Sequence, residues 1–416
     1  MDNTALLIVA FLALVAGILL GRFSRQISPK SARQSSAYVQ GLNFLLEDQS
    51  DHAVEEFLRA LDVNSDTLET HLSLGKLMRR QGHVNRAIRI HQNALARPAL
   101  SQEEQHEVHL ELARDFMAAG LLDRAELLLK EVILEAPELR SLAQRHLIEI
   151  YQDEKEWSEA VKVASSLLQS RYVKTQPEEK RYVQRMISHF YCEQAEQAND
   201  SGDVDLAKKL LSQAAGADKT GARVAVLSAS RFNIEGNYKA AIKSLSKLNA
   251  QNPAWFAACL PTLMESFEGI YGEQGAEKLW LHLQSVSVLP SIPEALFVVR
   301  QLVKTGRADD RQLAEHVLSE TLGIENAGEV STGRISAGHR VALLNALAGL
   351  ELDHDSSGEN ARSNTLGALY VALNDYLDTL KMYRCENCGF AGRELHWRCP
   401  SCKRWDSCLR IDQPAA

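Results

Sequence analysis

Four cysteines near the C-terminus form two pairs, Cys385 with Cys388 and Cys399 with Cys402, and ten residues separate the pairs. Each C-x-x-C pair can occupy a tight turn, and two such turns can direct four thiolates at one tetrahedral ion, either zinc or iron. Gly389 follows the first pair and allows the positive φ that such a turn often needs. Four unrelated thiols or two disulfides are the alternatives, but this spacing is typical of a metal site in an intracellular protein. The sequence therefore predicts one closed metal site with four cysteine ligands.

No other group of residues predicts chemistry. The thirteen histidines are scattered, and the chain contains no H-E-x-x-H, no G-x-S-x-G and no phosphate-binding glycine loop. Cys192 and Cys259 lie in apolar helical stretches and are expected in the core, and Cys408 is a surplus thiol. His396 is a ligand candidate only if one cysteine fails, and Trp397 is expected to cover the metal site or pack on the rest of the chain. We therefore expect a protein that is not an enzyme and has no catalytic residues.

The N-terminus predicts a membrane anchor. Ala5 to Leu20 is a run of sixteen apolar or small residues, which Gly21 extends to the short limit of a membrane-spanning helix. Asp2 precedes the run and the basic residues follow it, an order that argues against the alternative of a cleaved signal peptide. By the positive-inside rule, the N-terminus is outside the cytoplasm and the rest of the chain is inside. The prediction is an anchor over residues 1–21 and a basic linker over 22–36, with cations at Arg22, Arg25, Lys30 and Arg33.

Between residues 37 and 288 the chain is repetitive. Helical patterns alternate with short polar turns, and a small residue recurs at separations of 34, 38, 35, 47, 34 and 35, at Ala53, Ala87, Ala125, Ala160, Ala207, Ala241 and Ala276. A period near 34 is typical of tetratricopeptide repeats, in which each repeat is a pair of helices. Pro137 and Pro253 are expected to stop the second helix of their repeats. The predicted fold is an all-α tetratricopeptide-repeat solenoid.

Such a solenoid normally binds a peptide or a folded partner on its concave surface. In the register of these repeats, Lys76, Arg79 and Arg114 lie on the first helices and lean toward that surface. They are the candidate partner-binding residues, although an ordinary solvated basic face is an alternative interpretation of the same three cations.

The repeat pattern loosens after residue 288. Residues 289–381 are predicted to contain diverged helical repeats and loops, and residues 382–412 the metal module. The last predicted helix, Thr365 to Leu380, leads almost directly into Tyr383. We therefore expect the module to dock on the last helices of the solenoid.

The two cysteine motifs resemble one family. Tyr383 to Phe390 and Trp397 to Trp405 are similar to the rubredoxin-type, or zinc-ribbon-like, module of the lipopolysaccharide assembly protein B family, and the order of anchor, repeats and module is also the same. The resemblance implies a single-pass protein of the Gram-negative inner membrane, with a periplasmic N-terminus and a cytoplasmic body. It further implies an adaptor that acts with the FtsH protease to promote destruction of the LpxC deacetylase, alongside other lipopolysaccharide assembly proteins. The matching metal ligands are Cys385, Cys388, Cys399 and Cys402.

Two other functions fit parts of the sequence. A rubredoxin-like electron carrier would hold iron in the same kind of site, but the chain offers no second cofactor motif. A nucleic-acid-binding zinc ribbon would use the basic end of the chain, where residues 381–410 contain seven Lys or Arg and three acidic residues. Because the formal charge of the whole chain is −8, most of its surface is expected to repel phosphate, so a nucleic-acid partner is not expected.

Overall fold

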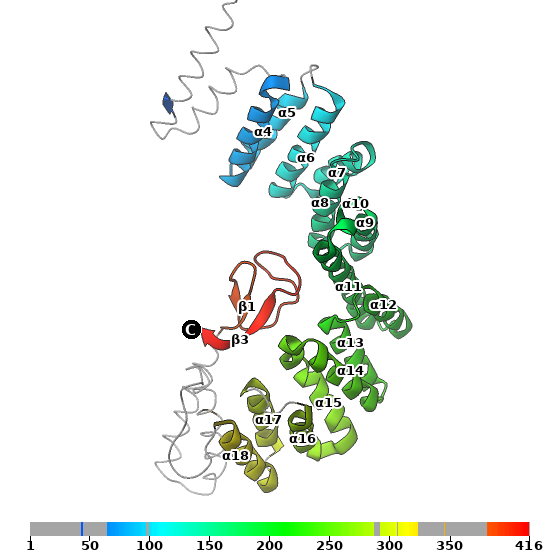
Figure 1. Cartoon of the computed structure of the whole chain (residues 1–416), viewed down its shortest axis with the longest axis vertical. Helices are drawn as coiled ribbons and strands as arrows, with labels where there is room; N and C mark the ends of the chain where they lie inside the picture. Colours follow the sequence, from blue (N-terminus) through cyan, green and yellow to red (C-terminus); the bar gives the residue numbers. More distant parts are fainter. Residues whose placement is uncertain are drawn as a thin grey trace, which may run out of the picture. The chain divides into compact units, whose positions relative to one another are not determined.

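The computed structural model describes residues 43–44, 65–96, 100–286, 292–305, 307–322, 345 and 381–415. The predicted anchor and linker, the repeat containing Ala53 and most of residues 323–380 lie outside the described residues. Within the described ranges no helix is both long and apolar enough to cross a membrane. The chain divides into two compact units between Glu156 and Trp157, and Figure 1 labels the α-helices of both units and strands β1 and β3.

The first unit consists of helices in its described part. They are α4 (Ser65–Arg80), α5 (Val84–Leu95), α6 (Gln102–Ala118), α7 (Leu122–Glu135) and α8 (Arg140–Asp153). The N-terminus of α6 is fixed by a capping box, in which the Ser101 hydroxyl accepts from the Glu104 amide and the Glu104 carboxylate accepts from the Ser101 amide. Helix α7 ends two residues before Pro137, as the sequence predicts.

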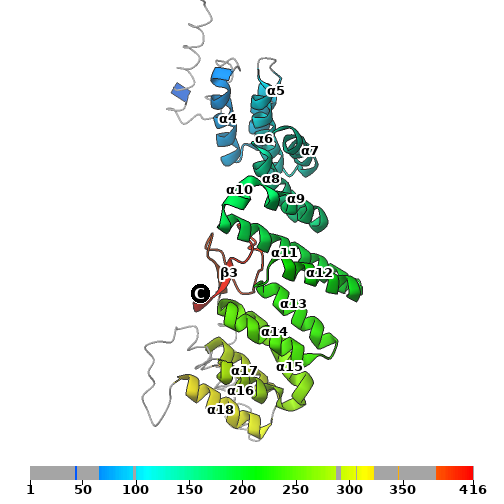
Figure 2. The same cartoon turned by 45° about the vertical axis from the view of Figure 1, so that its right-hand side comes forward.

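The second unit continues the helical pairs and ends in a small sheet (Figure 2). Its helices are α9 (Trp157–Gln169), α10 (Arg171–Thr175), α11 (Pro177–Asp200), α12 (Val204–Ala217), α13 (Ala222–Ile234), α14 (Tyr238–Gln251), η1 (Pro253–Cys259), α15 (Leu260–Tyr271), η2 (Gly272–Gln274), α16 (Gly275–Val286), α17 (Ile292–Thr305) and α18 (Ala308–Leu322). Helices α11 and α12, α13 and α14, α15 and α16, and α17 and α18 pack as pairs. The prediction of a helical-repeat solenoid is confirmed for these residues.

The recurring alanines occupy equivalent positions. In α5, α7, α9, α12 and α14 the recurring alanine is the fourth residue of its helix and is fully buried: Ala87, Ala125, Ala160, Ala207 and Ala241. A small buried side chain at this position lets neighbouring helices approach closely. The single long separation, 47 residues from Ala160 to Ala207, has a local cause, because the short helix α10 and the 24-residue helix α11 lie between them.

The turns before these helices repeat as well. Two residues before α5, α7, α9, α12 and α14, the backbone enters the left-handed region, with φ of 84°, 73°, 59°, 80° and 73° at Gly82, Gly120, Lys155, Gly202 and Gly236. Glycine adopts this conformation without a steric cost, which explains four of the five positions. Lys155 is the exception and carries a Cβ in a conformation that disfavours it.

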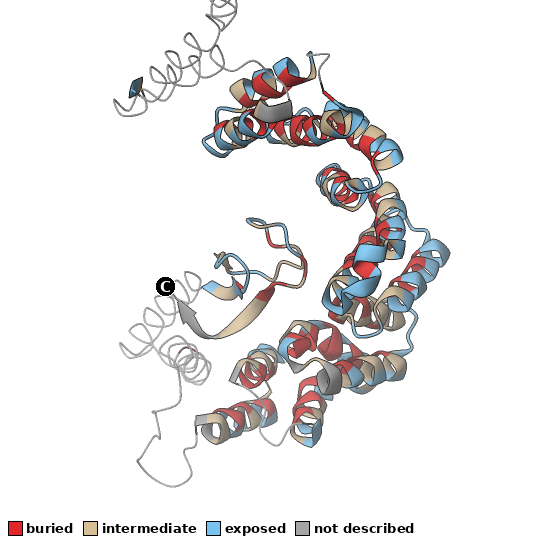
Figure 3. Ribbon diagram, turned by 45° about the horizontal axis from the view of Figure 1, so that its top comes forward, coloured by how far each residue is buried: buried red, intermediate tan, exposed pale blue. Residues whose placement is uncertain are grey.

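The C-terminal module is a three-stranded antiparallel sheet in the order β2-β1-β3. Its strands are β1 (Lys381–Cys385), β2 (Ala391–Gly392) and β3 (Cys408–Ala415). In the register of β1 and β3, Cys385 lies opposite Cys408. In the helical part of each unit, the buried residues lie on the faces along which neighbouring helices meet, shown in red in Figure 3. The largest core cluster of the second unit runs from Ala222 to Leu318 and also packs against Trp397 of the module.

Candidate metal centre and its docking surface

The two cysteine turns share one hydrogen-bond pattern. In the first, the Gly389 amide donates to the Cys385 carbonyl at 2.9 Å, and the Cys385 amide donates to the Phe390 carbonyl at 2.7 Å. In the second, the Lys403 amide donates to the Cys399 carbonyl and the Cys399 amide to the Arg404 carbonyl, both at 2.9 Å. Gly389 and Lys403 both have positive φ, 76° and 59°. The sequence identified Gly389 through its residue type but gave no such signal for Lys403.

These turns bring the four predicted ligands together. The Sγ atoms of Cys385, Cys388, Cys399 and Cys402 all lie within 4.8 Å of one another. The distance from Cys385 to Cys402 is 3.6 Å and that from Cys388 to Cys399 is 3.7 Å. A tetrahedral ion with metal–sulfur bonds of about 2.3 Å requires sulfur–sulfur distances of about 3.8 Å. The site therefore fits one tetrahedral ion, and four thiolates complete its coordination.

The surroundings already favour thiolates at two of these positions. Burial alone would raise the pKa of Cys385, but the Ser407 hydroxyl, 3.3 Å from its Sγ, and the backbone amides of Cys388 and Asn387 lower that pKa to about 6. For Cys402 the backbone amide of Arg404 and the side chain of Asn387 likewise outweigh burial and lower the pKa. A bound cation would compensate the charge that gathers when the sulfurs ionise together.

Cys399 differs from these two ligands, and Cys408 and His396 lie near the site without belonging to the four cysteines. Burial raises the pKa of the Cys399 thiol to about 12, so without an ion this ligand ionises less readily than Cys385 or Cys402. Cys408 is 1% exposed and packs in a cluster with Cys385 and Cys399, and burial raises its pKa. The His396 ring lies edge-on against Phe390, with centroids 5.9 Å apart, and is not part of the cysteine group. Cys192 and Cys259 are fully buried in the core, as expected.

Two tryptophans of the module dock on the helices of the second unit. Trp405 is 4% exposed and stacks on His189 of α11, with centroids 4.5 Å apart and planes 15° apart. Its ring also has edge contacts with Trp157 of α9 and Phe190 of α11, at 6.5 and 6.1 Å. Trp397 stacks on Trp255 of η1 at 5.0 Å. Stacked and edge-to-face aromatic pairs of this kind are stabilising beyond the apolar area that they bury.

Polar contacts surround this aromatic centre. The His189 Nε2 atom lies 2.9 Å from the Asp406 carboxylate, and Arg404 stacks on the Tyr182 ring at 5.3 Å. The Arg223 guanidinium lies 5.9 Å from the centroid of the Trp405 ring and forms ion pairs with two glutamates of α11. The last predicted helix, Thr365 to Leu380, lies outside the described residues, so docking on the last helices stays a prediction. Within the described residues, the aromatic and charged contacts of Trp397 and Trp405 are with α9, α11, α13 and η1.

The three candidate partner-binding cations lie together in the first unit. Lys76, Arg79 and Arg114 all approach the Glu111 carboxylate, at 3.6, 2.7 and 2.8 Å. Arg79 also contacts the fully buried carboxylate of Asp115, and its side chain is only 13% exposed. Lys76 and Arg114 are 43% and 37% exposed, so they remain accessible to a partner. Their role in partner binding stays a prediction, whereas Arg79 is held in an ion-pair network that sequence spacing did not reveal.

Comparison with known proteins supports the resemblance that the cysteine motifs indicate. Residues 383–408 match the rubredoxin metal binding domain family. Lipopolysaccharide assembly protein B of Escherichia coli K12 is 33% identical over 393 residues, which cover 94% of each chain. The protein of the same name from Haemophilus influenzae is 29% identical over 388 residues, which cover 91% of this chain and 90% of that one.

A solved structure also aligns with part of the chain. It is a kinesin light chain protein from Podosopora anserina with tetratricopeptide-like repeats, 18% identical, and it covers 49% of this chain and 97% of that one with a TM-score of 0.29. That TM-score is too low to support an argument about the fold.

Proposed function

The chain belongs to the lipopolysaccharide assembly protein B family, and on that premise we propose that it acts in lipopolysaccharide assembly as a membrane-anchored adaptor without enzymatic activity. In this proposal, the helical repeats bind protein partners on the cytoplasmic face of the inner membrane. They present the LpxC deacetylase to the FtsH protease and so restrain lipopolysaccharide synthesis. The observation that carries the proposal is the 33% identity over 94% of both chains.

The docked module gives this role a physical basis. Repeats in a solenoid normally contact only their neighbours, so the solenoid bends easily. Here the module contacts Trp157, His189, Arg223 and Trp255, which come from four separate helical elements of the second unit. Such a bridge fixes the relative positions of these helices, and a fixed surface loses less conformational entropy when a partner binds.

The metal would act on this bridge rather than in a reaction. Cys385, Cys388, Cys399 and Cys402 would hold zinc or iron, and the ion would supply a tetrahedral cross-link between the two turns. Trp397 lies just before, and Trp405 just after, the turn that holds Cys399 and Cys402. We propose that the ion keeps both tryptophans positioned against the helices and has no substrate.

The anchor belongs to the same proposal. The apolar run from Ala5 to Leu20, followed by basic residues, supports a single span with a periplasmic N-terminus. Anchoring would concentrate the adaptor near a membrane protease, which raises the effective concentration of the bound substrate. Lys76 and Arg114 are the accessible cations of the proposed partner surface, and Arg79 positions them through their shared partner, Glu111.

The test compares two cysteine substitutions in cells. Cys399→Ser removes a ligand, whereas Cys408→Ser changes an equally buried thiol that is not a ligand. We expect Cys399→Ser to abolish metal binding and to lengthen the half-life of LpxC, because the bridge is lost while the helices remain folded. Cys408→Ser is expected to retain both the metal and normal LpxC turnover. Normal turnover in a Cys399→Ser protein that lacks the metal would contradict the proposal, and the visible spectrum of the wild type separates iron from zinc.

A further inference from the structure

One stretch of the second unit is strongly basic in an acidic protein. Residues 206–252, which include most of α12 and all of α13 and α14, contain eight lysines and arginines and two acidic residues, whereas the whole chain has a formal charge of −8. Helix α14 contains three lysines and no acidic residue. A local excess of one charge on a folded surface attracts ligands of the opposite charge.

Some lysines elsewhere in the described residues are held in ion pairs. Lys130 pairs with Glu126 at 2.7 Å and Lys162 with Glu159 at 2.5 Å, each within one helical turn. By contrast, Lys219, Lys239, Lys243 and Lys247 are exposed, and within the described part of the chain none of them forms an ion pair. Their charges are therefore available to a ligand.

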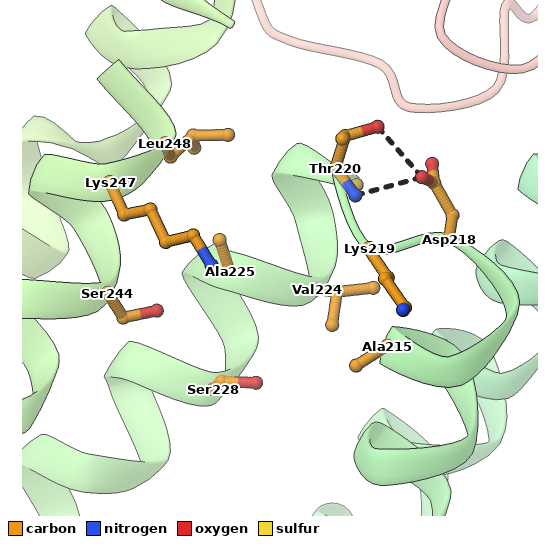
Figure 4. A pocket seen from close by; sticks show the side chains of 11 residues that line it. Ala215, Asp218, Lys219, Thr220, Val224, Ala225, Ser228, Ser244, Lys247 and Leu248 are labelled. Atoms are coloured by element: carbon orange, nitrogen blue, oxygen red, sulfur yellow. Dashed lines mark hydrogen bonds between the residues drawn. The ribbon is translucent and has the colours of Figure 1, made fainter. Parts of the chain in front are cut away.

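Two of these lysines line a cavity of about 160 Å³ between α12, α13 and α14 (Figure 4). Lys219 lies in the loop before α13, and the Lys247 side chain extends from α14 toward α13. The hydroxyl-bearing side chains of Ser228 and Ser244 line the same cavity. Two cations and the hydroxyl groups of Thr220, Ser228 and Ser244 thus border one space that no described side chain fills.

The single carboxylate at the cavity, Asp218, already accepts two hydrogen bonds. The Asp218 side chain accepts hydrogen bonds from the Thr220 amide and the Thr220 hydroxyl, both at 2.9 Å, and these bonds fix the loop before α13. Its negative charge still opposes an anion nearby, although the two bonds partly compensate it. Asp218 therefore provides a way to test the sign of the ligand charge.

We propose that this cavity binds a phosphate monoester. Lysine binds phosphate as a point charge, whereas planar carboxylates are better matched by the fork of an arginine, and here the unpaired cations are lysines. A tetrahedral phosphate can also accept hydrogen bonds from donors on different sides, as Ser228 and Ser244 on neighbouring helices would provide. The cavity has room for a phosphate and part of the group that carries it. The proposal is independent of the function proposed above.

The test measures phosphate binding to the full-length protein in detergent by isothermal titration calorimetry, with inorganic phosphate and glucose 1-phosphate as probes. We expect saturable one-to-one binding that Lys219→Ala and Lys247→Ala each weaken about fivefold, since each exposed charge contributes modestly. Lys239→Ala removes the same charge from the same helix outside the cavity and is expected to change the affinity by less than about twofold. Asp218→Asn can keep the bonds to Thr220 and is expected to tighten binding.

A second measurement distinguishes a lipid headgroup from a soluble phosphate as the ligand. The titration is repeated in phosphatidylcholine nanodiscs with and without phosphatidic acid. A weaker apparent affinity for glucose 1-phosphate in the presence of phosphatidic acid assigns the cavity to a lipid headgroup, and an unchanged affinity assigns it to a soluble phosphate. If Lys239→Ala and Lys247→Ala lowered the phosphate affinity equally, the proposal would be overturned, because the phosphate would then be attracted by the positive surface as a whole and not by the cavity. Tighter binding of a triglutamate peptide than of glucose 1-phosphate would also overturn it.

Discussion

Trp405→Ala separates metal binding from docking. Trp405 is not a ligand, and the turn that holds Cys399 and Cys402 is fixed by backbone bonds that the substitution leaves in place. Its ring, in contrast, contacts His189, Trp157 and Phe190 on the helices. We therefore expect the variant to keep one metal ion per chain and to release the module from the helices.

The magnitude follows from these contacts. Replacing a buried tryptophan with alanine costs about 3–5 kcal/mol. Three aromatic pairs, each contributing about 1 kcal/mol, place roughly 3 kcal/mol of that cost at the docking surface. A loss of about 3 kcal/mol lowers the docking equilibrium constant roughly a hundredfold.

Hydrogen exchange and metal analysis of the same sample provide the assay. We expect faster amide exchange in β1, β3 and η1, with unchanged metal content. Phe116→Ala is the control, because Phe116 is also a buried aromatic residue but lies in α6 of the first unit, and it should leave exchange in the module unchanged. In a double-mutant cycle, Trp405→Ala and His189→Ala should show a coupling of about 1 kcal/mol. Additive effects, or loss of the metal with undocking, would refute this reasoning.

Three further predictions concern the helices and the anchor. Burial alone would raise the pKa of Glu111, but Arg79 and two further cations lower it below its usual 4.5, so this network stabilises the fold fully above that value and loses its effect as pH falls through the lowered pKa. In urea unfolding at a series of acidic pH values, Glu111→Gln should therefore lose less stability than the wild type, and an equal loss would exclude the network. Lys155→Gly should raise the free energy of unfolding by about 0.5–1 kcal/mol, because φ at this turn is 59°, and a decrease would show that the lysine side chain matters more than the backbone. Deletion of residues 1–21 should move the protein from the membrane to the soluble fraction without loss of helicity by circular dichroism, whereas recovery of mature wild-type protein cleaved after the apolar run would contradict the anchor.

The sequence alone determined the parts of this protein that depend on short spacing. The ligand set was predictable because each C-x-x-C pair closes its own turn, and two turns suffice for a tetrahedron. The repeats were predictable because Ala87, Ala125 and their equivalents recur at one position of a helical pair, where only a small side chain fits.

The tertiary structure decided which distant residues meet. Trp405 was visible as an aromatic residue beside the metal, but nothing in its neighbourhood indicated contacts with Trp157 or His189, more than two hundred residues earlier. Arg79 likewise fitted the pattern of an exposed cation until folding placed it against the buried Asp115. Spacing along a chain reports contacts within a turn or a helical pair, whereas docking depends on how many successive helices stack, and each small rotation between them adds to the final position.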